Sequence, residues 1–512
     1  MQIPGRTLAA GLAVLLQISL QGQSPAPLAG QSPAAYHELF RPQFHFSPKE
    51  KWMNDPNGLV FFGGTYHLFF QYYPNDIVWG PMHWGHAISK DLIHWQQQPI
   101  ALYPDSLGYI FSGSAVVDSA NTSGFGREGK VPLVAIFTHH DPKGEKSGSV
   151  TYQNQSLAYS LDGGATWTKY AGNPVLKNPG ITDFRDPSVS WHPKEKKWVM
   201  SLATKDRISF YSSPDLKEWR KESEFGSDLG AHGGVWECPN LFELQDHWVL
   251  LVSNNPGGPN GGSGTQYFIG NWDGHRFIPS DTSTRWIDYG PDNYAGVTWN
   301  NTGGRRIFIG WMSNWDYANQ VPTKQWRNAM TIPRVLVTRS AEGGLWLTSE
   351  PIGIPDRLRE STIDRNNIPV KGSPGLSTGY RLQTAGHPYQ LHLEMAGDSS
   401  FSILLSNNRG EQVMVGYDKD RRQYYIDRSR SGITGFHKAF GRRYTAPRIS
   451  NDTNAHLTLL VDVSSLELFA DAGLTVMTAV FFPEHPLDGL QISSQKGMMI
   501  RHLSYSTLRS IW

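Results

Sequence analysis

Hydrophobic and aromatic residues dominate two adjacent segments, 58–62 and 65–72, on either side of the pair Gly63-Gly64. A two-glycine connection between β-rich segments is a strong hairpin signal, because glycine readily adopts the positive φ angles of the tight turn. The polar run 54–57, Asn-Asp-Pro-Asn, comes directly before the first segment. The pattern therefore predicts a β-hairpin whose first strand is entered through a polar motif.

The same plan recurs along the first 350 residues. Further polar motifs precede apolar strand-like segments at Phe111-Ser112-Gly113-Ser114, Arg185-Asp186-Pro187, Glu237-Cys238-Pro239 and Asp292-Asn293-Tyr294-Ala295. Ser-x-Asp turns that end on tryptophan follow several of the hairpins, at 89–95, 160–167 and 213–219. Repeats of about 50 to 75 residues, each with about four short strands, are typical of a β-propeller. We predict a five-bladed propeller over residues 36–350.

The remainder of the chain differs in pattern from these repeats. Residues 351–367 are mixed, charged and contain proline, and we predict a connector there. Segments 389–395, 413–417, 457–463 and 466–470 then have the character of short strands, which predicts an antiparallel β-sandwich over residues 368–512. The expected fold class is all-β, a five-bladed β-propeller followed by a C-terminal antiparallel β-sandwich.

The N-terminal segment 1–35 has the pattern of a targeting sequence. Arg6 precedes an apolar stretch, 8–20, that is shorter than the ~20 residues of a membrane-spanning helix, and a Pro-, Ser- and Ala-rich stretch follows. We therefore predict a signal peptide and linker over residues 1–35, and a secreted protein that is extracellular or periplasmic.

Composition narrows the class of partner. The chain has 46 Lys and Arg against 45 Asp and Glu, a net charge of +1, which argues against nucleic acid or an acidic membrane as partner. The 18 Trp and 21 Tyr suit a neutral, hydroxylated ligand, so we expect an oligo- or polysaccharide substrate. The single cysteine, Cys238, excludes an internal disulfide and a cysteine-based zinc cluster. A monomer and a homodimer both remain open.

Four of the five polar motifs carry a carboxylate: Asp55, Asp186, Glu237 and Asp292. In a propeller the innermost strand of each blade lines the central channel, so these four side chains are expected to converge at one mouth. Like charges in one funnel perturb one another's pKa values, which favours a functional site over four unrelated turns.

The motifs also carry a family resemblance. Segments 52–58, 111–114, 185–187 and 236–239 occur together and in order, and with them the chain resembles glycoside hydrolase family 32, the invertase, inulinase and levanase family. The resemblance implies a retaining β-fructofuranosidase in which Asp55 is the nucleophile and Glu237 the general acid and base. Asp186 would stabilise the transition state through fructose hydroxyls. No metal or organic cofactor is expected.

The resemblance implies substrate-binding residues as well. They are the hydroxyl partners Asn54, Gln71, Ser112 and Asp292, the charge-fixing Arg185, and the apolar walls Trp79, Phe111 and Trp315. Cys238 follows Glu237 in an extended strand, so its side chain is expected to face away from the channel.

The most specific hypothesis is a secreted enzyme that releases terminal fructose from inulin or levan and also cleaves sucrose. Three alternatives stay open: an invertase restricted to sucrose, a catalytically inactive fructan-binding propeller, and an inverting arabinan-type hydrolase. Product chromatography distinguishes the sucrose-restricted invertase from a fructan hydrolase. Substitution of Asp55 or Glu237 distinguishes an enzyme, which loses activity, from an inactive binding protein, which does not change. The configuration of the first-formed sugar separates the third.

Overall fold

The computed structural model describes residues 1–2, 36–353, 357–373 and 378–512. Nearly all of the predicted signal peptide and linker, residues 1–35, lies outside the described residues, so that assignment stays a prediction. No helix in the described part of the chain is long and apolar enough to cross a membrane. The helices found there are short, α1 (Pro142–Lys146) and the 3-10 helix η1 (Ala318–Gln320).

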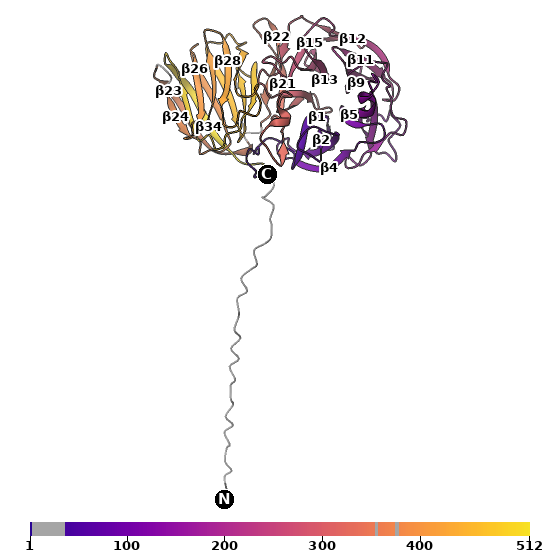
Figure 1. Cartoon of the computed structure of the whole chain (residues 1–512), viewed down its shortest axis with the longest axis horizontal. Helices are drawn as coiled ribbons and strands as arrows, with labels where there is room; N and C mark the ends of the chain where they lie inside the picture. The colour runs from indigo at the N-terminus through magenta and orange to yellow at the C-terminus, as the bar shows by residue number, and fades with distance from the viewer. Residues whose placement is uncertain (3–35, 354–356, 374–377) are drawn as a thin grey trace.

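The N-terminal domain consists of antiparallel sheets that follow one another along the chain (Figure 1). The first contains β1 (Lys51–Phe62), β2 (Thr65–Tyr73), β3 (His83–Ser89) and β4 (Gln96–Leu102), with β20 (Trp326–Arg327) parallel to β1. The second contains β5 (Tyr109–Val117), β6 (Leu133–His140), β7 (Gln153–Ser160) and β8 (Thr168–Lys169). The third contains β9 (Phe184–His192), β10 (Lys197–Thr204), β11 (Ile208–Ser213) and β12 (Arg220–Phe225).

Two further sheets complete this domain. One contains β13 (Val235–Leu244), β14 (His247–Asn255), β15 (Gly264–Trp272) and β16 (Phe277–Pro279), with β17 (Arg285–Trp286) beside β15. The other contains β18 (Tyr294–Thr298), β19 (Arg306–Trp311), β21 (Arg334–Ala341) and β22 (Gly344–Pro351). The first strands of successive sheets lie against each other in a ring, β1 on β5, β5 on β9, β9 on β13, β13 on β18 and β18 on β1. The domain is therefore propeller-like, with polar strand starts gathered around its centre.

Local sequence signals account for these sheets. Phe62 pairs with Thr65 across Gly63 and Gly64, which both have positive φ, so the predicted hairpin is confirmed. In each Ser-x-Asp turn the serine hydroxyl donates to the aspartate two residues later, at 2.7 Å between Ser160 and Asp162. The turns thus serve to end one strand and direct the next.

The C-terminal domain is a sandwich of two six-stranded sheets (Figure 1, orange to yellow). One has the order β23 (Arg359–Val370), β34 (Met498–Leu508), β25 (Tyr389–Ala396), β30 (Ala455–Val461), β31 (Ser465–Ala470), β32 (Thr475–Val480). The other has the order β24 (Tyr380–Gln383), β33 (Gly489–Ser493), β26 (Phe401–Ser406), β27 (Gln412–Asp418), β28 (Gln423–Arg430), β29 (Arg443–Pro447). Alternating apolar residues of both sheets form one buried core between them.

The predicted connector 351–367 is wrong in its second half. Strand β23 begins at Arg359 and pairs along its length with β34, the last strand of the chain. Its burial pattern explains the error, because nearly all of its side chains are exposed and no apolar alternation marks it as a strand. The sheet is completed by backbone pairing with a distant segment, which sequence periodicity does not reveal.

Charged side chains are buried where the two domains meet. His45 lies between Asp462 and Glu467 of the sandwich, at 2.8 Å from each. Arg334 of β21 contacts Asp288 at 2.9 Å and also Glu467. These ion pairs are almost fully buried and join the last propeller-like sheet and the segment before β1 to the sandwich.

Candidate active site

Each of the five inner strands carries a β-bulge at the same place. In every case two residues of the inner strand lie opposite one residue of the neighbouring strand. The two residues lie between Met53 and Pro56, Ile110 and Gly113, Arg185 and Ser188, Glu237 and Asn240, and Tyr294 and Val297. A bulge leaves an extra residue outside the ladder and re-aims the neighbouring side chains. The five bulges together redirect side chains at the centre of the ring.

The bulges bring the three predicted catalytic acids together from different register positions. Asp55 is the second residue of its bulge, Asp186 is the first residue of its own, and Glu237 comes just before one. The three acids therefore converge without occupying equivalent positions in their inner strands. Their convergence depends on the local backbone, including a positive φ of 64° at Asp186.

One cavity of about 270 Å³ collects ten of the eleven predicted site residues. They are Asn54, Asp55, Gln71, Trp79, Phe111, Ser112, Arg185, Asp186, Glu237 and Trp315. The side-chain amide nitrogen of Gln71 is buried and has no hydrogen-bond partner among the described residues. A buried donor without a partner is unfavourable, so this amide is available to a ligand.

Asp55 lines the cavity and is largely buried. Its Oδ1 accepts a hydrogen bond from Asn54 Nδ2 at 3.0 Å, and its Oδ2 accepts one from Ser112 Oγ at 2.9 Å. Burial and the nearby charge of Glu237 raise the pKa of Asp55, while these two donors oppose the rise. The donors favour the carboxylate form and fix its orientation.

Glu237 is held by two side chains. Arg185 donates to its Oε1 from Nε at 3.1 Å and from Nη2 at 2.9 Å, and the Tyr294 hydroxyl donates to Oε2. Arg185 also forms an ion pair with Asp183. Burial lowers the pKa of Arg185, but the surrounding carboxylates outweigh this effect and hold the pKa well above its usual range. The guanidinium therefore stays charged and offsets the acids of the pocket.

Tyr294 was not predicted as a site residue. It occupies in β18 the position that Glu237 occupies in β13, since each is the last paired residue before the bulge. Sequence inspection aligned Asp292 with that position, two residues too early. The repeat register of the fifth sheet was the signal that would have identified Tyr294.

Cys238 faces the acids, contrary to the expectation that it points away. Its Sγ lies 3.6 Å from Asp55 Oδ2 and 3.7 Å from Asp186 Oδ2, and its backbone N–H donates to Asp186 Oδ2 at 3.1 Å. The bulge and a φ of 46° at Cys238 break the alternation on which the expectation rested. Burial and the two carboxylates raise the pKa of Cys238 well above its usual value, so the thiol remains protonated.

Burial likewise raises the pKa of Asp186, and the charges of Glu237 and Asp55 add to this while Arg185 opposes it. Asp186 therefore ionises less readily than an isolated carboxyl group, and it shares its pocket with Asp55 and Glu237. Coupled carboxylates of this kind are typical of catalytic sites.

Asp292 lies outside the cavity and is fully buried. Its carboxylate accepts hydrogen bonds from Tyr317 Oη at 2.5 Å, Arg428 Nη1 at 2.5 Å and the backbone N–H of Val480 at 2.8 Å. Since Arg428 and Val480 belong to the sandwich, the predicted hydroxyl-binding role of Asp292 is wrong. Its role is to join the two domains.

The rim contains aromatic walls and several residues that sequence analysis missed. Trp79 is partly exposed and packs edge-to-face on Phe111, whose other neighbour is the stacked ring of His140 at 4.2 Å. His140 Nε2 pairs with Glu145 on α1 at 3.1 Å. The missed lining residues are His140, Glu145, Tyr152, Gln153, Asp183 and Asn255. Most come from loops and strand ends outside the repeated motifs, so no repeat pattern marked them.

The chain matches known proteins over both of its domains. The profile of the glycosyl hydrolases family 32 N-terminal domain matches residues 45–350, and that of the family 32 C-terminal domain matches residues 355–509. A levanase of Bacillus subtilis is 45% identical over 93% of this chain and 72% of its own length. An extracellular exo-inulinase of Aspergillus niger is 41% identical over 88% of this chain and 91% of its own. An invertase of Schizosaccharomyces pombe is 36% identical over 93% and 86%.

A solved structure has the same overall arrangement. The crystal structure of exo-inulinase from Aspergillus awamori superposes with a TM-score of 0.85 at 37% identity, covering 93% of this chain and 100% of the other. The similarity extends over both domains.

Proposed function

We propose that this chain, which belongs to glycosyl hydrolase family 32, releases fructose by a double displacement at the pocket around Asp55. Its activity is that of a β-fructofuranosidase, which hydrolyses fructans and sucrose, like the activities for which the levanase, exo-inulinase and invertase relatives are named. The observation that carries the residue assignments is the shared pocket of Asp55 and Glu237, in which the two carboxyl groups have different hydrogen-bond partners.

In the first step the Asp55 carboxylate attacks C2 of the terminal fructosyl unit while the Glu237 carboxyl group donates its proton to the leaving oxygen. The bond from C2 to that oxygen breaks and a covalent fructosyl–Asp55 ester forms. Asn54 and Ser112 support this assignment because their hydrogen bonds orient the carboxylate and favour its charged form.

In the second step Glu237, now ionised, takes a proton from water, and the resulting hydroxide attacks C2 and releases Asp55. Asp186 binds ring hydroxyls and stabilises the developing positive charge on the sugar. Arg185 and Tyr294 hold Glu237 in place through both steps, in agreement with their contacts to its two oxygens.

The cavity supports attack at a chain end. Its volume of about 270 Å³ leaves room for a terminal unit beside Asp55, and Trp79, Phe111 and Trp315 are among its lining residues. We propose release of terminal fructose from inulin, levan and sucrose. Restriction to sucrose is the second candidate, because an invertase is among the relatives.

Two wider assignments belong to the same proposal. The ring of five inner strands supports a five-bladed propeller for residues 36–350. The extracellular exo-inulinase relative supports secretion, together with the predicted signal peptide.

The experiment is product chromatography after incubation with sucrose, inulin and levan. Free fructose from all three substrates is the expected result. Fructose from sucrose alone would establish the second candidate, and internal fragments of the polymers would contradict attack at the chain end. NMR of the first-formed fructose should show the β-configuration of the substrate at C2, because a double displacement retains the configuration. Inversion at C2 would refute Asp55 as nucleophile.

Substitution tests the residue assignments. Glu237→Gln should lower kcat about 10²- to 10⁴-fold, as loss of a general acid does, and Asp55→Asn should remove turnover. Asp246→Asn, at an exposed aspartate of the β13–β14 turn, is the matched control and should leave kcat unchanged. A binding protein without catalysis would show no turnover in any of the four proteins.

A further inference from the structure

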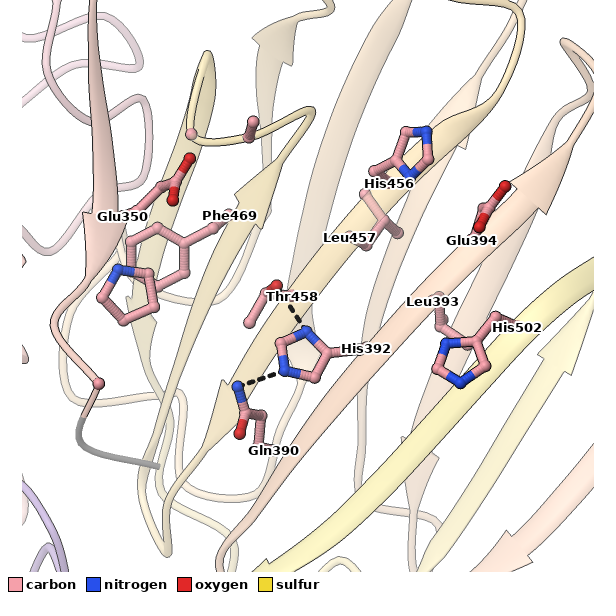
Figure 2. A pocket seen from close by; sticks show the side chains of 14 residues that line it. Glu350, Gln390, His392, Leu393, Glu394, His456, Leu457, Thr458, Phe469 and His502 are labelled. Atoms are coloured by element: carbon pink, nitrogen blue, oxygen red, sulfur yellow. Dashed lines mark hydrogen bonds between the residues drawn. The ribbon is translucent and has the colours of Figure 1, made fainter. Parts of the chain in front are cut away.

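A second and larger cavity, of about 660 Å³, lies where the end of β22 meets the sandwich (Figure 2). Glu350 and Pro351 form one side of it, and side chains of β25, β30 and β34 form the other. Among the described residues it shares no lining residue with the catalytic pocket, which has less than half its volume. A cavity of this size at a domain junction is within the ~300–1,000 Å³ of small-molecule sites.

Polar side chains form a regular row across three neighbouring strands in this cavity. Glu394 of β25 pairs in register with His456 of β30 on one side and with His502 of β34 on the other. Directly paired residues of adjacent strands project from the same face of a sheet, and Figure 2 shows these three side chains on one face. Two residues along β25, His392 lies opposite Thr458 on the same face.

Gln390 continues this face and has an incomplete set of hydrogen bonds. Its Nε2 contacts His392 Nε2 at 2.5 Å, and His392 Nδ1 contacts Thr458 Oγ1 at 2.9 Å. The Gln390 side chain is buried, and its Oε1 has no hydrogen-bond partner among the described residues. Buried acceptors are normally paired, so an unpaired one in the wall of a cavity indicates a group that is supplied by a ligand.

The carboxylates that line this cavity already have arginine partners. Glu394 lies 3.8 Å from Arg501, and Glu350 lies 3.1 Å from Arg339. His456 lies 3.9 Å from Asp452, and His502 lies 3.8 Å from Asp364. Neither lining carboxylate is therefore left as an unpaired charge for a cationic ligand. The cavity instead offers histidine, carboxylate, amide and hydroxyl groups that act as donors or acceptors toward sugar hydroxyls.

We propose that this cavity, called here the sandwich groove and defined by Gln390, His392, Glu394, His456, Thr458 and His502, binds a segment of a fructan chain. The inference rests on the proposed function for the identity of the polymer. Its volume exceeds that of the catalytic pocket, so the groove accommodates more than the single end unit. Binding there keeps chain ends near the enzyme and raises their effective concentration at Asp55.

The test separates binding from hydrolysis. In an Asp55→Asn background, which binds without turnover, the double variant His456→Ala/His502→Ala is compared with its parent by affinity electrophoresis in gels containing inulin or levan. Both side chains are nearly half exposed, so their removal leaves the core intact. His485→Ala, an exposed histidine of the same domain outside the groove, is the matched control. Thermal melting checks that all three variants are folded.

We expect the double variant to bind inulin or levan about fivefold more weakly than the control, the effect of losing about one hydrogen bond of ordinary strength. In the active enzyme the same double substitution should raise the ratio of KM for inulin to KM for sucrose by a similar factor. Equal retention of the double variant and the control, or an equal rise of both KM values, overturns the groove as a fructan site.

Two other results have distinct meanings. Unchanged retention with a shift in elution volume on size exclusion overturns the proposal in favour of an interface between copies of this chain. Failure of the unsubstituted enzyme to release fructose from sucrose or fructans would refute the proposed function. That failure leaves the gel assay intact, because the assay requires no turnover.

Discussion

Asp292→Asn is the substitution that most sharply distinguishes a structural carboxylate from a substrate-binding one. The residue belongs by sequence to the polar motif of the fifth sheet, yet its carboxylate contacts Arg428 and Val480 of the sandwich. Asparagine keeps the size of the side chain and removes its charge. The perturbation therefore acts on the buried ion pair and leaves packing nearly unchanged.

The magnitude follows from burial. Both charged side chains of the pair are fully buried, and the carboxylate also accepts from Tyr317. Burial lowers the pKa of Arg428 and the charge of Asp292 raises it. Because an arginine side chain stays protonated in proteins, Asp292→Asn leaves a buried guanidinium without its opposite charge. Removing one partner of a buried pair typically lowers the free energy of unfolding by about 3–5 kcal/mol. Total stabilities are about 5–15 kcal/mol, so the loss is a large fraction.

Differential scanning calorimetry and steady-state kinetics on sucrose together test this prediction. We expect an apparent melting temperature lower by on the order of 10 °C, with kcat and KM unchanged at temperatures below the transition. Asp246→Asn again serves as the exposed control and should melt like the parent. An unchanged melting temperature combined with a tenfold higher KM would refute the structural role and restore Asp292 to the substrate site.

Three further substitutions test the site and the domain junction. Tyr294→Phe removes one hydrogen bond to Glu237, and a hydrogen bond to a charged acceptor contributes about 1.5–3 kcal/mol. We therefore expect kcat on sucrose to fall about 10- to 100-fold with little change in KM. A kcat equal to that of the parent would contradict the positioning role of Tyr294. Cys238→Ala should lower kcat by less than about tenfold, because a thiol is a weak donor to Asp55, and a loss as complete as that of Asp55→Asn would argue against this. Burial lowers the pKa of His45, but two sandwich carboxylates outweigh this effect and raise it to about 9. Protonated His45 therefore adds about 3 kcal/mol to the free energy of unfolding below pH 6.5, and this contribution is lost as the pH rises through 9. Denaturant midpoints between pH 6 and 10 should fall in the parent and much less in His45→Gln.

The sequence could indicate which acids share the pocket, because each proposed catalytic residue belongs to a short motif near the start of an inner strand. The hairpin at Gly63-Gly64 and the later strand pairs follow from local patterns, and the structure confirms them. The domain junction could not be predicted in this way. His45 and Asp462 are separated by more than 400 residues, and no local pattern specifies that they meet.

The direction of the side chains at the site depends on backbone that periodicity does not describe. Cys238 was expected to face away because alternation along a strand assumes regular pairing. One extra residue in the ladder reverses the face of every side chain beyond it. A bulge is also the reference point in the fifth inner strand, β18. Counted from its bulge, the residue that corresponds to Glu237 of β13 is Tyr294 and not Asp292.

A sequence signal for the bulges nevertheless exists. Pro187 and Pro239 are the second residues of two of the bulges, and Gly296 has the same place in a third. Proline lacks the N–H needed for a central ladder, so a proline inside a central strand favours a bulge. The residues before these two prolines have positive φ, 64° at Asp186 and 46° at Cys238, a strained conformation of the kind that clusters at functional sites. Aligning Cys238-Pro239 with Asp186-Pro187, instead of counting alternation from Glu237, therefore places the thiol among the acids.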